Sequence, residues 1–412
     1  MNSLLGRFLR YVRIDTRADE AGQATPSSPG QWALARLLAE ELTALGLHDV
    51  RVGGHAYVTA RLEATPGATG PAMAFLAHLD TACEAPGAAQ PRVIKDYDGG
   101  DIRLDTGLLL SPRQFPALAG QAGKTLIVAG GDTLLGADDK AGIAIIMTAL
   151  ERLCRGGTPH GPVLVAFVPD EEIGHGAELL DLDAFGAAFA YTVDGTGLGT
   201  LEWETFNAAR AEIGIKGVSI HPGYAKDRMI NAILVAQAVL DALPADETPA
   251  TTSGREGFFH VLHCSGEVDA AHLSILVRDH DARAFAARKA RLQAIVDECN
   301  RRWSLPDGQP AVVLELRDQY RNMGEYLARV PHVVDTALRA MRDCGLTPQV
   351  SPVRGGTDGA RLSARGLPCP NLFCGGRNCH GPYEYAVLED MEQAVRVLIR
   401  LAELYAHGVP AA

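Results

Sequence analysis

The sequence is poor in cysteine, has no excess of positive charge and contains no long apolar run. Its 412 residues include eight cysteines, and no two of them form a Cys-x-x-Cys pair, so neither a disulfide scaffold nor a zinc ribbon is expected. The formal net charge of −12 argues against nucleic acid as a partner, because phosphate binding needs a basic surface. The apolar stretch around Gly142–Leu150 is too short to cross a bilayer, which takes about 20 residues.

The N-terminal segment also lacks the apolar core and small-residue cleavage site of a secretory signal. We therefore expect a cytoplasmic protein with reduced thiols and no membrane contact. What the sequence does contain is an ordinary globular composition, with 47% hydrophobic and 21% charged residues. A chain of 412 residues exceeds the roughly 100–200 residues of one domain, so two domains are expected.

Patterns of buried strands alternate with patterns of helices in the first half of the chain. Met73–Ala77, Val163–Val168 and Phe189–Val193 are short apolar runs, which indicate buried strands. Trp32–Gly46 and Gly142–Leu153 have the apolar spacing of helices. This alternation predicts an α/β fold with a mostly parallel central sheet.

The pattern changes after about residue 207. Strands and helices follow there in the order of a small β-α-β-β-α unit: Ala211–Ser219, Met229–Leu243, Phe258–Cys264, Ala271–Arg278 and Ala282–Trp303. From Asn322 the α/β pattern resumes. We therefore expect a discontinuous core domain of residues 1–207 and 320–412, with an α+β domain of residues 208–319 inserted in it.

Acidic residues and histidines stand where several of the expected strands end. They are His78 and Asp80, Asp138 and Asp139 at the start of a helix, Glu171 and Glu172, Asp194, and His380. In an open α/β sheet, ligands bind beyond the carboxyl ends of the strands. Imidazole nitrogens and carboxylate oxygens of this kind suit Zn²⁺, with Co²⁺ or Mn²⁺ as substitutes.

Each of these short motifs is weak evidence for a metal site by itself. The Asp138-Asp139 pair could be an acidic helix N-cap, and Glu171-Glu172 could be a solvated turn. In the metal interpretation, one carboxylate of the aspartate pair bridges two ions about 3.5–4 Å apart. Asp80, two residues after His78, can hold the second nitrogen of that imidazole and fix its tautomer.

Patterns of other enzyme classes are missing. There is no Gly-x-Ser-x-Gly elbow and no His-Glu-x-x-His helix, so a serine hydrolase or a thermolysin-type enzyme is not expected. Gly123-Lys124-Thr125 matches the last three residues of a P-loop motif. Leu118 occupies the position of the required first glycine, so no P-loop is expected.

Seven motifs together resemble one family. HLDT, GADDKAGIA, PDEEIG, YTVDG, IHPG, RGGTDGA and GLPCPNLFCGG with its following N-x-H-G stand in the order and approximate spacing of the di-zinc exopeptidases, which include carboxypeptidase G and the aminoacylases. The resemblance runs from LLGRFLRYVRIDT to the final helix. It implies a zinc-exopeptidase-like α/β/α catalytic domain with an inserted α+β lid and dimerisation domain. It also implies an aminopeptidase that removes the N-terminal residue of short peptides, preferably tripeptides.

The resemblance assigns the site residues as well. His78, Asp138 and Asp194 would hold one zinc ion. Asp138, Glu172 and His380 would hold a second one. Asp80 would orient His78, and Glu171 would be the general base. The choice of Asp138 over Asp139 rests on the resemblance, and the one departure noted, Ile145 in place of an acid, lies outside this ligand set.

Residues of both domains would contribute to substrate binding. By the resemblance, His221 of the IHPG motif reaches the active site of the other subunit in a homodimer formed through the lid. Arg354, and with it Arg278, would bind the C-terminal carboxylate of a peptide, because a guanidinium can contact both carboxylate oxygens. Without the resemblance, a loop histidine before proline is idle or structural, and both arginines are ordinary surface or salt-bridged residues.

Two alternatives stay open. A related di-zinc amidohydrolase or carboxypeptidase would act on N-acyl amino acids or dipeptides with the same metal ligands. A non-catalytic zinc-dependent binding protein on the same scaffold is disfavoured by Glu171, because a binding protein needs no general base.

Overall fold

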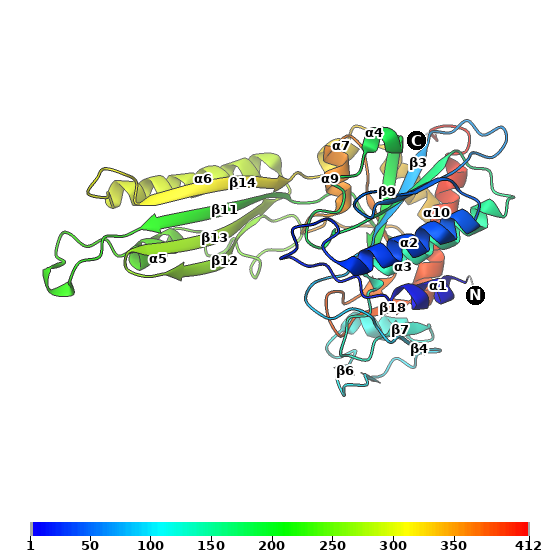
Figure 1. Ribbon diagram of the computed structural model, residues 1–412, viewed down its shortest axis with the longest axis horizontal. Coiled ribbons are helices and arrows are strands. Elements are labelled where there is room, and N and C mark those ends of the chain that lie inside the picture. Colours follow the sequence, from blue (N-terminus) through cyan, green and yellow to red (C-terminus); the bar gives the residue numbers. More distant parts are fainter. Residues whose placement is uncertain (1–2, 411–412) are drawn as a thin grey trace. The chain divides into compact units, whose positions relative to one another are not determined.

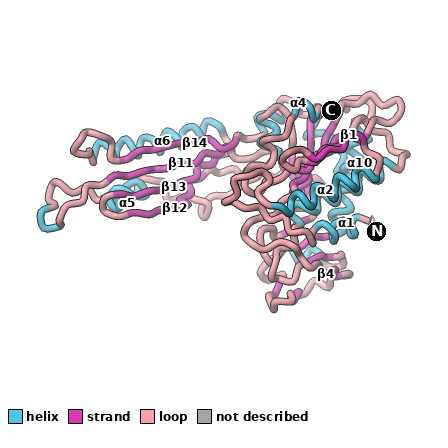
Figure 2. Tube along the Cα trace, in the orientation of Figure 1, coloured by secondary structure: helices cyan, strands magenta, loops and turns pink. Residues whose placement is uncertain are grey.

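A computed structural model describes residues 3–410 of the chain, which form two compact units (Figures 1 and 2). The first unit comprises the residues up to Trp203, Met323–Ser351, and those from Thr357 onward. The second comprises Glu204–Asn322 and Pro352–Gly356. No helix among residues 3–410 is long and apolar enough to cross a membrane.

The first unit is built on an eight-stranded sheet with the order β1-β2-β8-β3-β9-β16-β10-β15. The bounds are β1 His48–Val52, β2 Val58–Leu62, β3 Met73–His78, β8 Val163–Val168, β9 Phe189–Gly195, β10 Thr200–Glu202, β15 Gln349–Val350 and β16 Asn371–Phe373. The four central strands β8, β3, β9 and β16 are parallel, whereas β1, β2 and β10 pair antiparallel with neighbours. The expected α/β fold with a mostly parallel central sheet is confirmed.

Helices cover both faces of this sheet, which explains why its central strands are apolar throughout. Every residue of β3 and β8 is buried, as is typical of strands without a solvent-facing side. One face packs against α1 Leu4–Tyr11, α2 Pro29–Ala44, α3 Ala137–Cys154, α8 His332–Asp343 and α10 Leu388–Leu404. The other packs against α4 Leu182–Phe185 and α9 Asp358–Ala364.

Helix α3 lies very close to the sheet. It starts at Ala137, after Gly136 in the left-handed conformation, so Asp138 and Asp139 lie at the start of the helix, as the sequence predicts, ahead of the apolar spacing that begins at Gly142. A Cβ added at Gly142 would lie 2.0 Å from the Val193 carbonyl oxygen of β9 and 2.3 Å from Asp139 Oδ1. Glycine therefore lets the first turns of α3 approach the strand end directly.

A second, small sheet of the first unit was not predicted. Its strands are β4 Arg92–Ile94, β7 Leu126–Val128, β17 Gly376–Arg377 and β18 Tyr385–Val387, in the order β17-β18-β7-β4. A hairpin of β5 Ile102–Arg103 and β6 Leu109–Leu110, the 3₁₀ helix η1 Pro116–Gln121 and the short helix α7 Gly324–Leu327 complete the unit. Strands of two or three residues are too short for a recognisable periodicity.

The second unit is an antiparallel sheet with two helices on one face. The strands are β11 Asn207–Lys216, β12 Phe258–Gly266, β13 Ala270–Asp279 and β14 Val312–Tyr320, in the order β12-β13-β11-β14. The helices are α5 Ala232–Asp241 and α6 Ala282–Arg302, and a short 3₁₀ helix η2 spans Pro222–Tyr224. Alternate residues such as Ile213 and Leu273 point into the core, so these strands show the period of two of a one-sided sheet.

The second unit differs from the expected inserted domain in two respects. Strand β14 was missed, although Val312, Leu314 and Leu316 alternate with exposed or half-exposed residues. The unit begins at Glu204, ends at Asn322 and takes in Pro352–Gly356 as well, whereas residues 208–319 alone were expected. The segment Pro352–Gly356 joins this unit through an isolated parallel bridge between Val353 and Thr205.

Candidate metal centre

The fold brings seven of the predicted residues to one edge of the large sheet. His78 ends β3, Asp194 is the penultimate residue of β9, and Glu171 and Glu172 follow β8. Asp138 lies in the first turn of α3. Because β8, β3 and β9 are adjacent and parallel, their carboxyl ends meet at the same edge. Asp80 and His380 complete the group, from the loop after β3 and the loop between β17 and β18.

Asp138 lies between the two histidines. Its Oδ1 is 2.9 Å from His78 Nε2, and its Oδ2 is 3.3 Å from His380 Nε2. One carboxylate oxygen therefore faces each imidazole, which is the arrangement that a carboxylate bridging two metal ions requires.

Each histidine has one further carboxylate beside the same nitrogen. Asp194 Oδ1 is 3.8 Å from His78 Nε2, and Glu172 Oε2 is 3.1 Å from His380 Nε2. Two three-residue groups that share Asp138 result, and they are the two ligand sets that the resemblance implied. His78, Asp138 and Glu172 can also offer ligand atoms that all lie within 4.8 Å of one another.

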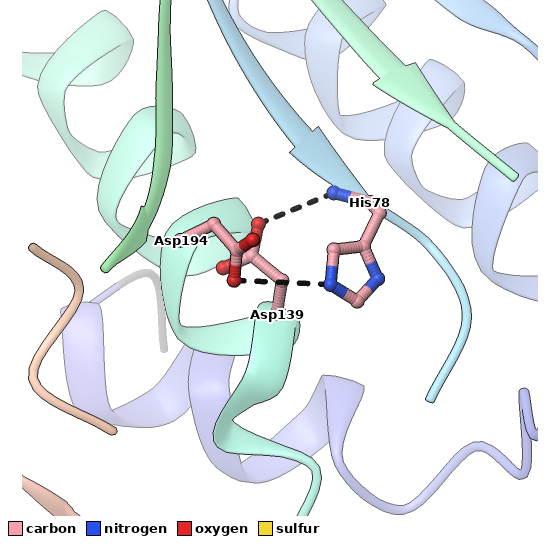
Figure 3. Close-up of side chains that lie close together, drawn as sticks. All are labelled: His78, Asp139 and Asp194. Atoms are coloured by element: carbon pink, nitrogen blue, oxygen red, sulfur yellow. Dashed lines mark hydrogen bonds and ion pairs between the residues drawn. The ribbon is translucent and has the colours of Figure 1, made fainter. Parts of the chain in front are cut away.

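Asp139 is beside His78 as well, but its oxygens are engaged by the backbone (Figure 3). Oδ2 accepts the His78 N–H at 3.2 Å, and Oδ1 accepts the Gly142 N–H at 3.2 Å. Asp139 and Asp194 also form a group with His78 whose potential ligand atoms lie within 4.8 Å of one another. The backbone contacts give Asp139 a different task, which is to join the end of β3 to the first turn of α3.

Asp80 does more than the sequence suggested. Its Oδ1 lies 3.3 Å from His78 Nδ1, as expected for a residue that orients the imidazole. Its two oxygens also accept the backbone N–H groups of Glu171 and Glu172, each at 3.0 Å. A single buried carboxylate thus holds both the histidine and the turn that carries the two glutamates.

The electrostatics follow from many carboxylates in one buried place. Burial, reinforced by the negative Asp138, raises the pKa of Glu172 to about 7. Burial likewise raises the pKa of Glu171 and of Asp194. Burial opposes ionisation of Asp138 too, but hydrogen bonds from His380 and His78 outweigh it and hold the Asp138 pKa below its usual range.

The histidines are affected in the opposite sense. Burial by itself would lower the pKa of His78, but Asp138 and Asp80 raise it well above its usual value. Hydrogen bonds to Asp138 and Glu172 raise the pKa of His380 to about 11 against the effect of burial. Both shifts report strong negative potential at the two imidazoles, which is the potential that a cation site needs.

The donor set fits metal ions in a further respect. Among the residues that the structure describes, Glu172 Oε1 is a buried oxygen without a hydrogen-bond partner. Buried acceptors are almost always satisfied, so an acceptor of this kind next to two imidazoles fits a cation. Nitrogen and oxygen donors in this combination are those that Zn²⁺ takes in hydrolytic enzymes.

The three predicted substrate residues all lie in the second unit. His221 is exposed and caps η2, where its Nδ1 accepts the Gly223 N–H at 3.2 Å. Arg278 is the penultimate residue of β13 and is 9% exposed. Its guanidinium donates to the Ala209 and Val277 carbonyls, each at 3.3 Å.

Arg354 lies in the strip Pro352–Gly356, which belongs to the second unit, whereas the sequence predicted it in the core domain of residues 320–412. The guanidinium is 5.2 Å from the ring of Phe206 and 5.4 Å from the ring of Phe258. It donates to the carbonyl oxygens of Gly254 and Glu256, each at 3.0 Å. The hydroxyl of Thr252 accepts a third hydrogen bond at 2.7 Å.

Sequence reasoning missed several residues that hold the site. Glu384 is 2% exposed and accepts the backbone N–H of Asp138 at 3.1 Å. Asp170 accepts the Ser27 N–H at 2.7 Å and Gln31 Nε2 at 2.6 Å, which fixes the start of the turn before Glu171. The only sequence feature that could have indicated a role for Glu384 is its position four residues after His380.

Comparisons with known proteins agree on the family and the fold. The model of "Peptidase family M20/M25/M40" matches residues 135–404. Peptidase T of Shouchella clausii is 49% identical over 406 residues, covering 98% of both chains. Peptidase T of Clostridium perfringens is 47% identical over 408 residues, covering 98% of this chain and all of the relative.

Solved structures resemble the whole chain. Aminopeptidase PepT from Bacillus cereus has a TM-score of 0.78 at 22% identity, covering 98% of both chains. A tripeptidase from Staphylococcus aureus has a TM-score of 0.75 at 21% identity, with the same coverage. A dinuclear metal-binding peptidase from Bacillus subtilis has a TM-score of 0.65 at 15% identity, covering 98% of this chain and 97% of that one. These likenesses show the shared fold.

Asp138 and Asp139 differ in what their replacement should change. If Asp138 bridges two cations, Asp138→Asn removes their shared anion, so we expect fewer metal ions per chain than in the wild type, measured by elemental analysis after reconstitution with Zn²⁺. Asp139→Asn should retain more metal but unfold more easily, by about 1–3 kcal/mol, because a buried backbone N–H loses its acceptor. Full metal occupancy in Asp138→Asn combined with metal loss in Asp139→Asn would assign the bridge to Asp139.

Proposed function

The chain belongs to peptidase family M20/M25/M40, and from that membership we propose that it is a metallo-aminopeptidase that removes the N-terminal residue of short peptides, preferably tripeptides. The observation that carries this proposal is the position of Asp138 between His78 and His380, with one carboxylate oxygen toward each imidazole. The relatives named Peptidase T, at 47–49% identity over nearly the whole chain, favour this activity over that of a related amidohydrolase or carboxypeptidase.

The resident metal in this proposal is a pair of zinc ions, with Co²⁺ or Mn²⁺ as substitutes. His78, Asp138 and Asp194 would hold one ion, and Asp138, Glu172 and His380 would hold the other. Bound there, the ions would lower the pKa of a water molecule and polarise the peptide carbonyl. The close approach of Glu172 and Asp138 to the His380 nitrogen supports the second set.

Glu171 is the general base. It takes the proton of the attacking water and later donates it to the leaving amine. Its neighbour Glu172 binds metal. The backbone N–H groups of both glutamates donate hydrogen bonds to the Asp80 carboxylate, which fixes the turn. This fixed turn supports the division of labour, because a base must stay within hydrogen-bond reach of the proton that it removes.

Arg354 binds the C-terminal carboxylate of the peptide, with Arg278 as a second contributor. The three contacts to Gly254, Glu256 and Thr252 account for three of the five N–H donors of a guanidinium. We assign the others to the substrate carboxylate. The two aromatic rings beside Arg354 support this, because they keep the guanidinium plane in one orientation.

The active form is a homodimer that assembles through the second unit, and the partner subunit's His221 stabilises the oxyanion of the tetrahedral intermediate. Support comes from exposed apolar side chains on α5 and on the edge strand β12: Ile233, Leu234, Val261 and Leu262. An exposed edge strand is ready to pair with another chain, and exposed large apolar side chains on it and on α5 favour such contact. All eight cysteines are free, which supports a cytoplasmic location.

Replacement of the base should separate chemistry from metal binding. Glu171→Gln is expected to lower kcat for a tripeptide by about 100- to 10,000-fold, the usual contribution of a general base. Zinc content should stay at the wild-type value, because Glu171 is not a ligand. Glu178→Gln is the matched control, since Glu178 lies in the same loop but is paired with Arg361. Turnover of Glu171→Gln near that of the control would refute the assignment.

Substrates with and without a C-terminal charge should reveal the role of Arg354. Arg354→Ala is expected to raise KM strongly for free tripeptides and much less for their C-terminal amides. Arg354→Lys should rescue poorly, because an ammonium group cannot reproduce a planar two-point contact. An equal loss for both substrates would mean that Arg354 only holds the loop of Gly254 and Glu256.

The dimer can be tested through one exposed residue of α5. Leu234, 58% exposed, is replaced by glutamate, and Leu179→Glu in the first unit serves as control, since Leu179 is 53% exposed. Sedimentation should show a wild-type dimer, a monomer of low activity for Leu234→Glu, and an unchanged dimer for the control. A wild-type protein that is monomeric and fully active would rule out both the dimer and the role of His221 across it.

A further inference from the structure

Glu384 is a buried carboxylate beside the metal centre that belongs to neither ligand set. Its Oε2 accepts the Gly136 N–H at 2.7 Å, and its Oε1 accepts the Asp138 N–H at 3.1 Å. It lies in the same loop as His380, between β17 and β18. Both oxygens thus bind backbone of the segment that carries the bridging aspartate.

The backbone around Asp138 needs such an acceptor. N–H groups in the first turn of a helix have no partner within the helix. Here Gly136 is left-handed, with a φ of 78°, and Asp138 and Asp139 have non-helical backbone angles inside the first turn of α3. A carboxylate at this position satisfies two donors and is favoured by the positive end of the helix.

Glu384 also connects the two loops that carry metal ligands. The Glu384 N–H donates to the Gly381 carbonyl at 3.2 Å, and Asn378 Nδ2 donates to the Tyr383 carbonyl at 3.3 Å, so the loop around His380 is closed on itself. The antiparallel pair of β17 and β18 anchors both ends of this loop. Through Glu384, a loop fixed on one sheet is thereby tied to the start of α3.

We propose that Glu384 is a positioning residue that holds Asp138 and His380 at the separation required by a metal ion shared with Glu172. It touches neither substrate nor metal. The inference rests on the proposed metal function of these ligands. It follows that loss of Glu384 weakens metal binding most at the Asp138, Glu172 and His380 site, where both loops contribute a ligand, and less at the site of His78 and Asp194.

The side chain offers two graded replacements. Glutamine keeps the length of Glu384 but has only one acceptor oxygen. Its NH₂ group would therefore face one of the two backbone N–H groups, and two donors cannot form a hydrogen bond. Aspartate keeps both oxygens but is shorter, so it should weaken both contacts without removing the charge.

A matched control lies in the same stretch of chain. Glu389, at the start of α10, accepts the Thr125 N–H with Oε1 at 3.0 Å and Oε2 at 2.9 Å. It therefore makes the same kind of carboxylate-to-backbone contact between distant segments, but neither Thr125 nor Glu389 is in a ligand loop. Glu389→Gln should therefore lower the stability of the fold as any loss of such a contact does, but it should leave the zinc affinity unchanged.

The experiment measures zinc affinity of the full chain. Metal-free wild type, Glu384→Gln, Glu384→Asp and Glu389→Gln are titrated with Zn²⁺ against a fluorescent chelator, and unfolding of the metal-free proteins is followed by circular dichroism. Replacement of outer-shell partners typically weakens metal binding about 10- to 100-fold. We expect a loss in this range for Glu384→Gln at one of two sites, a smaller loss for Glu384→Asp, and wild-type affinity for Glu389→Gln. At saturating zinc, KM for a tripeptide should not change.

The outcomes separate this inference from the proposed function. Wild-type zinc affinity in both Glu384 variants, with a lower unfolding temperature alone, would overturn the positioning role and leave the function untouched. Failure of the wild type to bind zinc would overturn the function and this inference with it. If Glu384→Gln does not fold, Glu384→Asp carries the test, and an affinity equal to that of Glu389→Gln would again overturn the inference.

Discussion

The Asp138 carboxylate, placed between two imidazoles, is the constraint on which the rest of the site depends. Asp80, Asp139, Glu171, Glu172 and Asp194 lie around it on one buried edge of the sheet. Carboxylates in such a place repel one another and lose their hydration. Bound cations remove both penalties at once, and a shared anion lets the two cations lie close together. The same charge density that makes the site unfavourable without metal therefore favours the binding of cations there.

The fold meets this constraint with carboxylates that bind the backbone. Asp80 accepts the N–H groups of both catalytic-turn glutamates, and Asp139 joins β3 to α3 through two further N–H groups. Gly142 permits the close contact between α3 and β9 that brings these segments together. The main chains of His78, Glu171 and Glu172 are thus held in place, so these side chains need little freedom to reach a metal ion. Such preorganisation is what a hydrolytic metal site requires.

The fold class and the grouping of the ligands were predictable from the sequence, because buried parallel strands are continuous apolar runs and their ends face one edge. The predicted strand Val163–Val168 has the same first and last residues as β8. The change of pattern near residue 207 predicted two units. Strand β14 was missed although its apolar residues alternate with exposed ones. The short strands β17 and β18 near His380 were not predictable, since segments of two or three residues lack a clear period. Glu384 and Asp170 act through contacts to backbone distant in sequence, which no local pattern encodes.

Whether Asp138 bridges a pair of zinc ions can be seen in crystals grown with Zn²⁺ and measured on both sides of the zinc absorption edge. If it does, two anomalous peaks lie about 3.5–4 Å apart, one beside His78 and one beside His380, with the Asp138 carboxylate between them. A single peak, or two peaks bridged by Asp139, would rule out this bridge.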